Sequence, residues 1–177
     1  VRMSKRTGKS LTLTDLLDEI PVDAARFFFN SRAAETQMEF DLDLAVKQDS
    51  DNPLYYVQYA HARICSLIAA LKEAGSSVEK VENLAVSVLS SDEEKDLIKQ
   101  ISLLPEEIRL AARDYDPSRI NRYVMELAAR FHRFYNARRI KGEQPEILAA
   151  RLKLADDARA VLKNGLKLIG VDAPEKM

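Results

Sequence analysis

The segment LYYVQYAHARICSLIAAL, residues Leu54–Leu71, decides the fold class of this chain. At about 100° per residue, its aliphatic side chains fall on one stripe of an α-helix. The stripe consists of Leu54, Val57, Ala60, Ile64, Leu67, Ile68 and Leu71. A helix with a continuous apolar face buries that face, so we expect the stripe to line the core of a helical bundle.

The face opposite this stripe carries aromatic rings and a guanidinium group. Tyr55, Tyr59 and Arg63 fall there, with Tyr56 at its flank. Rings stack on unpaired bases with a gain of about 1–3 kcal/mol each, and arginine adds charge and a second planar surface. These residues therefore predict an RNA-binding surface; the alternative is that the tyrosines pack on a neighbouring helix or on the amino-terminal module. His61 falls within the core stripe, where we expect a hydrogen-bonded core histidine rather than an RNA contact.

Helical patterns continue to the end of the chain. After a polar break at Asp49–Pro53, we expect helices at about 53–74, 78–89, 105–114, 117–140 and 145–168. The first of these stops at Gly75, and a further helix starts from a cap at Ser91 with acids in its first turn. Residues 1–48 predict a small α+β module instead. Its elements are an extended piece at Leu11–Leu13, a helix 15–20 capped by Thr14, a helix 24–31 capped by Asp23, and a strand at 37–40. The expected fold is mainly α: an antiparallel helical bundle over 49–177 behind the α+β module.

The segment Pro117–Ile140 predicts a long helix with a basic outer face. Its buried stripe comprises Ile120, Tyr123, Val124, Leu127, Phe131, Phe134 and Tyr135. The opposite ridge comprises Arg119, Arg122, Arg130 and Arg133, followed by Arg138 and Arg139. Such a ridge could hold RNA phosphates and make binding sensitive to salt. The alternative is a solvated face whose charges pair with acids near 106–107 and 156–157.

Composition excludes several classes of protein. The 177 residues are 46% hydrophobic and 31% charged, with no apolar run long enough to cross a bilayer, so we expect a cytoplasmic protein without a membrane partner. Cys65 is the single cysteine, which rules out a disulfide framework and the usual zinc clusters, and we predict no metal site. The net charge of −1 does not indicate a nucleic-acid binder, but RNA responds to local patches.

The chain opens with a basic loop. Residues 1–10 contain four cations and no acid, and lysine with backbone amides can stabilise charge on a transferring phosphate. The loop is not a Walker A motif, because the leading glycine that should precede Gly8-Lys9-Ser10 is missing. No serine or cysteine nucleophile has a recognisable base partner, and Cys65 lies on the core side of its helix. Because the sequence starts without methionine, we expect it to be part of a longer protein.

Several segments together resemble one family. Arg2-Met3-Ser4-Lys5-Arg6 resembles the KMSKS loop of class I aminoacyl-tRNA synthetases, and DAARFF (23–28) is close to the DALR signature that names an anticodon-binding domain. YVQYAHAR (56–63), FHRFYNARR (131–139) and NGLKLIGVDAPEKM (164–177) follow. This ordered set is similar to arginyl-tRNA synthetases of bacterial type, although cysteinyl and other class I synthetases share the bundle.

The resemblance implies an activity that needs more than this chain. Such enzymes activate arginine with ATP and Mg and transfer it to the terminal adenosine of tRNA(Arg). Their catalytic Rossmann domain and HIGH motif would lie upstream, so we expect this chain alone to be inactive and to bind no cofactor itself. By resemblance, residues 2–6 form the ATP loop and Lys5 is the catalytic lysine of the full enzyme. Arg2 and Arg6 replace the first lysine and the final serine of that loop.

The resemblance also implies the partners. Residues 49–177 would bind the anticodon loop, with Tyr56, Tyr59 and the terminal Met177 near it, while residues 1–48 would be a stem-contact module touching the inner corner of the tRNA. The predicted tRNA contacts are Tyr55, Tyr56, Tyr59, Arg63, Arg130, Arg133 and Met177. We expect a monomer that binds tRNA(Arg) and its own catalytic domain, and no DNA. The alternative is a stand-alone helical adaptor that docks a protein partner through the Tyr/Arg face.

Overall fold

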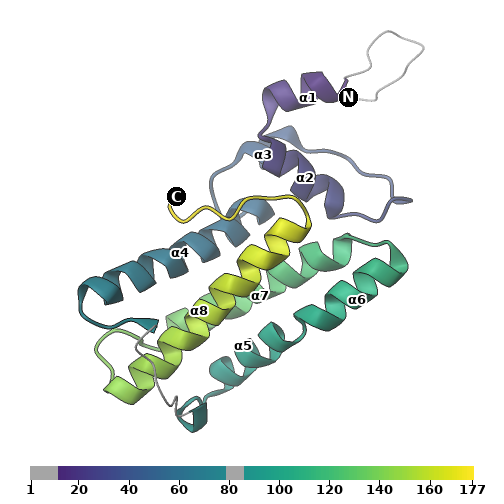
Figure 1. Cartoon of the computed structure of the whole chain (residues 1–177). Coiled ribbons are helices and arrows are strands. Elements are labelled where there is room, and N and C mark those ends of the chain that lie inside the picture. Colours follow the sequence, from purple (N-terminus) through teal and green to yellow (C-terminus); the bar gives the residue numbers. More distant parts are fainter. Residues whose placement is uncertain (1–11, 79–85) are drawn as a thin grey trace.

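Helices make up the regular structure of this chain in a computed structural model that describes residues 12–78 and 86–177 (Figure 1). The bundle helices are α4 (Pro53–Glu73), α5 (Asp92–Ser102), α6 (Leu104–Asp114), α7 (Ser118–Ala137) and α8 (Pro145–Leu168). They are preceded by α1 (Leu13–Glu19), α2 (Val22–Asn30) and α3 (Leu42–Val46), and a 3₁₀ turn, η3 (Val86–Val88), leads into α5. The predicted mainly α bundle is confirmed.

Helix α7 is the centre of the bundle, because it packs against α4, α5, α6 and α8. Its predicted stripe is buried apart from the half-exposed Tyr135, and Val124, Leu127, Phe131 and Phe134 are sealed from solvent. The stripe of α4 faces it as expected: five of its residues are buried, while Leu67 and Ile68 are partly covered. Each fully buried aliphatic or aromatic side chain contributes about 1.5–3 kcal/mol, so this interface holds the outer face of α4 in place.

Helices α7 and α8 approach each other closely at Gly165. A Cβ atom added there would lie 2.5 Å from Cγ1 of Val124, well inside van der Waals contact. The absence of a side chain at this position therefore sets the distance between the two helices.

Local capping signals position several helix ends. Asn52 caps α4 by accepting from the amides of Leu54 and Tyr55, and Ser91 forms a capping box with Glu94 at the start of α5. α4 ends before Gly75 and α8 runs from Pro145 to Leu168, as predicted. Of the helix predicted at 78–89, residues 79–85 lie outside the described ranges, and residues 86–88 form the turn η3.

The amino-terminal region differs from the expected α+β module, because residues 12–48 contain helices and loops but no strand. Thr12 rather than Thr14 caps the first helix, through a capping box with Asp15. Of the extended piece expected at 11–13, Thr12 has the predicted extended backbone, but Leu13 is already helical. Helix α2 begins at Val22, ahead of Asp23, and α3 was not predicted.

The strand predicted at 37–40 is also absent. The ring of Phe40 packs on Phe28 and Phe29, with centroids 5.5 and 5.4 Å apart. A segment with alternating polar and apolar residues forms a strand only where a partner strand can pair with it. Here Phe40 packs against helix α2 instead.

Candidate nucleic-acid interface

A row of aromatic rings lies on the side of α4 that faces away from the core. The rings of Tyr55 and Tyr59, one helical turn apart, are stacked with centroids 6.2 Å apart and planes 6° apart. His132 of α7 continues the row, with its ring 6.0 Å from that of Tyr59 and tilted by 24°. The rings of Tyr55, Tyr59 and His132 are called the ring platform below. Tyr59 is 41% exposed, so the platform presents ring surface to solvent.

Tyr56 anchors the flank of the platform. Its ring is half-buried and lies 4.9 Å from the ring of His132. Burial raises the pKa of the Tyr56 hydroxyl, and the positive charge of Arg133 acts in the opposite direction. The tyrosines thus contact the neighbouring helix α7 through His132, as the alternative interpretation expected, while Tyr59 still exposes ring surface to solvent.

The guanidinium of Arg63 is held beside the rings. Its central carbon lies 4.2 Å from the ring centroid of Tyr135 and 5.9 Å from that of Tyr59. Cation–π contacts of this kind contribute about 0.5–1 kcal/mol at exposed sites, enough to bias an arginine toward one orientation. The platform therefore has a cation at one edge, with its orientation biased by the two rings.

These side chains surround an open hollow of about 560 Å³. Its lining consists of Ser50, Tyr55, Tyr56, Tyr59, Arg63, His132 and Asn136. That volume falls in the range of about 300–1,000 Å³ seen for small-molecule sites, and the lining combines aromatic faces with amide, hydroxyl and guanidinium groups. The arrangement suits a flat heteroaromatic group that carries hydrogen-bonding edges and a nearby negative charge.

His132 and Asn136 belong to the hollow but were missed in the sequence analysis. Within the described ranges, Nε2 of His132 is buried and has no hydrogen-bond partner. Burial lowers the pKa of His132, and the charge of Arg63 lowers it further, so the ring is neutral at pH 7. The available signal was their spacing of four residues on α7, which places both on one flank of that helix.

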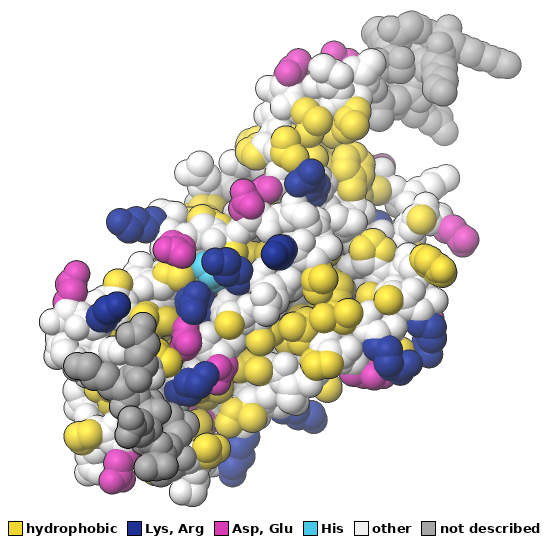
Figure 2. All heavy atoms as spheres, in the orientation of Figure 1, with side chains coloured by type: hydrophobic (Ala, Val, Ile, Leu, Met, Phe, Trp, Pro, Cys, Tyr) yellow, Lys and Arg dark blue, Asp and Glu magenta, His cyan; other side chains and the backbone are white. Residues whose placement is uncertain are grey.

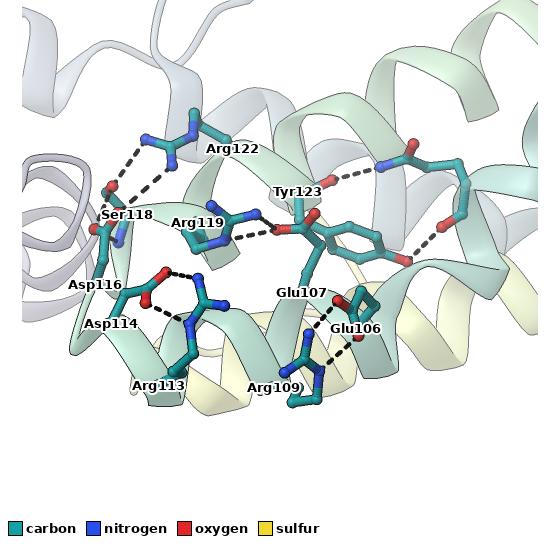
Figure 3. Close-up of polar contacts among 11 residues, drawn as sticks. Glu106, Glu107, Arg109, Arg113, Asp114, Asp116, Ser118, Arg119, Arg122 and Tyr123 are labelled. Atoms are coloured by element: carbon teal, nitrogen blue, oxygen red, sulfur yellow. Dashed lines mark hydrogen bonds and ion pairs between the residues drawn. The ribbon is translucent and has the colours of Figure 1, made fainter.

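The predicted arginine ridge on α7 is largely paired with acids. Arg119 lies 3.0 Å from Glu107, as the solvated-face interpretation expected, and Arg122 lies 3.6 Å from Asp116 (Figure 3). Arg138 pairs with Glu93 of α5 at 2.7 Å. The predicted pairing of the ridge with acids near 156–157 is wrong, because Asp156 pairs with Arg159 and Asp157 pairs with Lys153, all on helix α8.

Arg130 and Arg133 share one acid, Asp96 of α5, at 3.2 and 3.3 Å. Arg130 also pairs with Glu126 and is mostly covered. Arg133 is more exposed, and its charge acts on Tyr56, which places it near the platform. Both remain predicted tRNA contacts, and Arg133 has the better position.

The carboxy-terminal tail, residues 169–177, runs beside the first half of α4 (Figure 1). Nδ1 of His61 donates to the carbonyl oxygen of Pro174 at 2.8 Å, and His61 is fully buried, which confirms a hydrogen-bonded core histidine. Cys65 is half-buried beside that ring, and burial raises the pKa of its thiol, as expected of an unreactive cysteine. Met177 ends the tail with 53% of its surface exposed.

The same chain matches the family of DALR anticodon binding domains over residues 57–177. It belongs to that family. The DALR domain here includes the whole ring platform apart from Tyr55, together with the tail. The ATP-loop residues 2–6, with Lys5, lie outside the described ranges.

Curated relatives of this DALR domain are arginine–tRNA ligases. Those of Caldanaerobacter subterraneus and Acetivibrio thermocellus are each 51% identical to it, over 100% and 99% of this chain. The chain spans about a third of their length, 32% and 31% respectively. The match falls on their carboxy-terminal part.

Solved structures similar to this chain are also arginyl-tRNA synthetases. An arginyl-tRNA synthetase structure from Campylobacter jejuni superposes with a TM-score of 0.86 at 32% identity, over all of this chain and 37% of the other. The arginyl-tRNA synthetase of Thermus thermophilus gives 0.76 at 25% identity, over 98% of this chain and 29% of that one. Of the helices described for the DALR domain and the region before it, none is both long and apolar enough to cross a membrane.

Proposed function

We propose that this chain is the tRNA-binding portion of an arginine–tRNA ligase and that its ring platform receives the anticodon loop of tRNA(Arg). The observation that carries the proposal is the row formed by Tyr55, Tyr59 and His132, with Arg63 at its edge, on the exposed side of a DALR anticodon-binding domain. Unpaired bases can stack on the rings while Arg63 and Arg133 attract phosphate. The relatives named arginine–tRNA ligase support the choice of tRNA.

The full enzyme would couple ATP, L-arginine and tRNA(Arg) to arginyl-tRNA(Arg), AMP and diphosphate. Its catalytic domain would precede this chain, and Lys5 in the loop 2–6 would stabilise charge on the reacting phosphate, with ATP and Mg bound there. Residues 1–48 would contact the inner corner of the tRNA, and residues 49–177 would form the anticodon domain. We further propose a cytoplasmic monomer, and expect no arginine-dependent exchange of ATP with pyrophosphate from this chain alone.

Filter binding with tRNA(Arg) and a second tRNA tests the proposal. We expect a preference for tRNA(Arg), and a Tyr59→Ala variant that binds it about 5- to 150-fold more weakly, since stacking contributes about 1–3 kcal/mol per base. Tyr115→Ala is the matched control, because Tyr115 is an exposed tyrosine at the far end of α6. Equal affinity for both tRNAs, or unchanged binding by Tyr59→Ala, would contradict the proposal. The latter outcome with a protein bound to the same face would indicate the adaptor function.

A further inference from the structure

We propose that helix α2 is a clamp that positions the carboxy-terminal tail, and with it Met177, beside the ring platform. The positioning residues are Asp23, Arg26 and Asn30. This inference rests on the proposed function, since it assigns these residues a role in binding the anticodon loop, although they lie outside the platform and before the bundle.

Three side chains on one face of α2 hold the tail by its backbone. Nδ2 of Asn30 donates to the carbonyl oxygen of Ile169 at 3.3 Å, and Nη1 of Arg26 donates to that of Gly170 at 2.7 Å. Oδ2 of Asp23 accepts from the amide of Asp172 at 3.1 Å. Positions 23, 26 and 30 are spaced by three and four residues, so they form one row along the helix, and the tail follows that row.

The turn at Gly170 delivers the tail to this row. Gly170 has a φ of +72°, and the amide of Val171 returns to the carbonyl of Leu166 at 3.0 Å, which closes the end of α8. A Cβ atom at Gly170 would lie 3.5 Å from Cδ of Arg26. The stem of Arg26 therefore covers the turn while its guanidinium binds the carbonyl.

Helix α4 supplies the second half of the clamp. Nε2 of Gln58 donates both to Oδ2 of Asp23 at 3.3 Å and to the carbonyl oxygen of Asp172 at 2.9 Å. His61 binds the carbonyl of Pro174 a little further along. The contacts that Gln58 and His61 make with the tail go to backbone carbonyl oxygens, so they fix where the tail runs without depending on its side chains.

The clamp ends just before the exposed terminus. Met177 follows Pro174 by three residues, a reach of about 10 Å of extended chain. Tail contacts move from Gln58 to His61 in step with the chain, so the tail runs along α4 toward the carboxyl end of that helix, and the reach of its last three residues includes the turn that carries Tyr59. An apolar thioether held there can pack on a base that stacks against the rings. Without the clamp, the Met177 side chain would sample many positions, and the entropic cost of ordering it on RNA binding would offset the gain from this contact.

A double-mutant cycle in the 177-residue chain tests the clamp. The variants are Arg26→Ala, a deletion of residues 175–177, and both together, with the affinity for tRNA(Arg) as the measurement. We expect each single change to weaken binding about tenfold, and the combination to weaken it no more than the deletion does, because Arg26 acts through the tail. Arg109→Ala, which removes an exposed ion pair with Glu106 on α6, should leave binding unchanged.

A conservative variant separates positioning from general stability. Asp23→Asn keeps an oxygen that can accept from the amide of Asp172, so it should bind tRNA(Arg) within about twofold of the unchanged chain, whereas Asp23→Ala should match Arg26→Ala. Additive losses in the cycle, or an Arg26→Ala variant with full affinity, would overturn the inference.

Release of tail residues by carboxypeptidase provides a measurement without RNA. Arg26→Ala and Asp23→Ala should release residues up to Pro174 several-fold faster than the unchanged chain, with the same thermal midpoint for global unfolding. Equal release rates refute the clamp even if the chain prefers tRNA(Arg). Faster release in a chain with no such preference would refute the proposed function, and with it the role of the clamp in RNA binding.

Discussion

At the scale of single residues, the buried carboxylate of Glu94 and its partner Arg151 connect several elements of the bundle. Glu94 is 1% exposed, yet it is an acid that caps α5. Burial favours its protonated form, but hydrogen bonds from Ser91 and Arg151 outweigh burial and lower the pKa of Glu94. Arg151 lies 2.7 Å from that carboxylate and also donates to the carbonyl of Arg139, so one guanidinium joins α5, α8 and the loop that follows α7.

Removal of this guanidinium should be costly. We expect Arg151→Ala to lower the free energy of unfolding by about 3 kcal/mol or more, because it leaves Glu94 as a buried charge with its main partner missing. Urea denaturation monitored by circular dichroism measures the effect. The exposed pair of Arg109 and Glu106 is the control, since Arg109→Ala should lower the free energy of unfolding far less than Arg151→Ala does. Equal losses in the two variants would show that burial of the pair has no bearing on its contribution.

At the scale of elements, the helices of this chain differ in how favourably their ends are capped. Helix α5 has a complete capping box and three acids in its first turn. Helix α6 is followed instead by Tyr115 as its C-cap, which takes a left-handed conformation with φ of 52° and is 91% exposed. Side chains other than glycine are strained in that region, and an exposed ring has little packing to offset the strain.

A glycine should therefore suit position 115 better. We expect Tyr115→Gly to raise the free energy of unfolding by about 1 kcal/mol, in contrast to Ala112→Gly inside α6, which should lower it by a similar amount, about 1 kcal/mol. Thermal and urea unfolding of both variants measure the difference. A loss of stability in Tyr115→Gly would mean that the ring contributes more than the backbone conformation costs.

At the scale of the whole molecule, α4 joins the bundle to the carboxy-terminal tail through the hydrogen bonds of Gln58 and His61. Basic and acidic side chains are interspersed over the face seen in Figure 2, and hydrophobic side chains gather near α1 and α2. The described residues of that end include the exposed Leu13, Leu17 and Val22. His61 joins the core to the tail, and both histidines have their pKa lowered, first of all by burial.

The lowered pKa of His61 makes the stability of the whole chain depend on pH. Unfolded histidine takes up a proton near pH 6.5, while the folded ring resists it, so the native state loses stability as pH falls below about 6.5. The pKa values of carboxyl groups such as Glu93 and Glu94 are lowered, so these groups titrate at lower pH than the histidines do. The change in stability between pH 7.5 and 5.5 is therefore assigned to the histidines. We expect the thermal midpoint to fall from pH 7.5 to 5.5, and to fall less in His61→Gln, with His132 causing the remainder. An identical fall in both proteins would contradict this assignment.

The sequence was sufficient for much of the bundle and for the tyrosine face. Hydrophobic periodicity located α4 and α8, and it placed Tyr59 outward and His61 inward, because a helix repeats its faces over a few residues. The same method failed at residues 37–40, where Phe40 packs on α2 instead of a partner strand. It also missed His132, since its neighbour Tyr59 is 73 residues away and local patterns contain no such information.

The amino-acid sequence by itself determined which side chains each helix buries and which it exposes, because that depends on spacing within one or two helical turns. The tertiary structure alone decided what those exposed groups meet. It placed a neutral histidine in the row of tyrosines, paired most of the arginine ridge of α7 with acids, and laid the carboxy-terminal tail across α2 and α4. The physical reason is that stacking, ion pairing and backbone capture act between segments far apart in the chain, and only packing of the core fixes their distances.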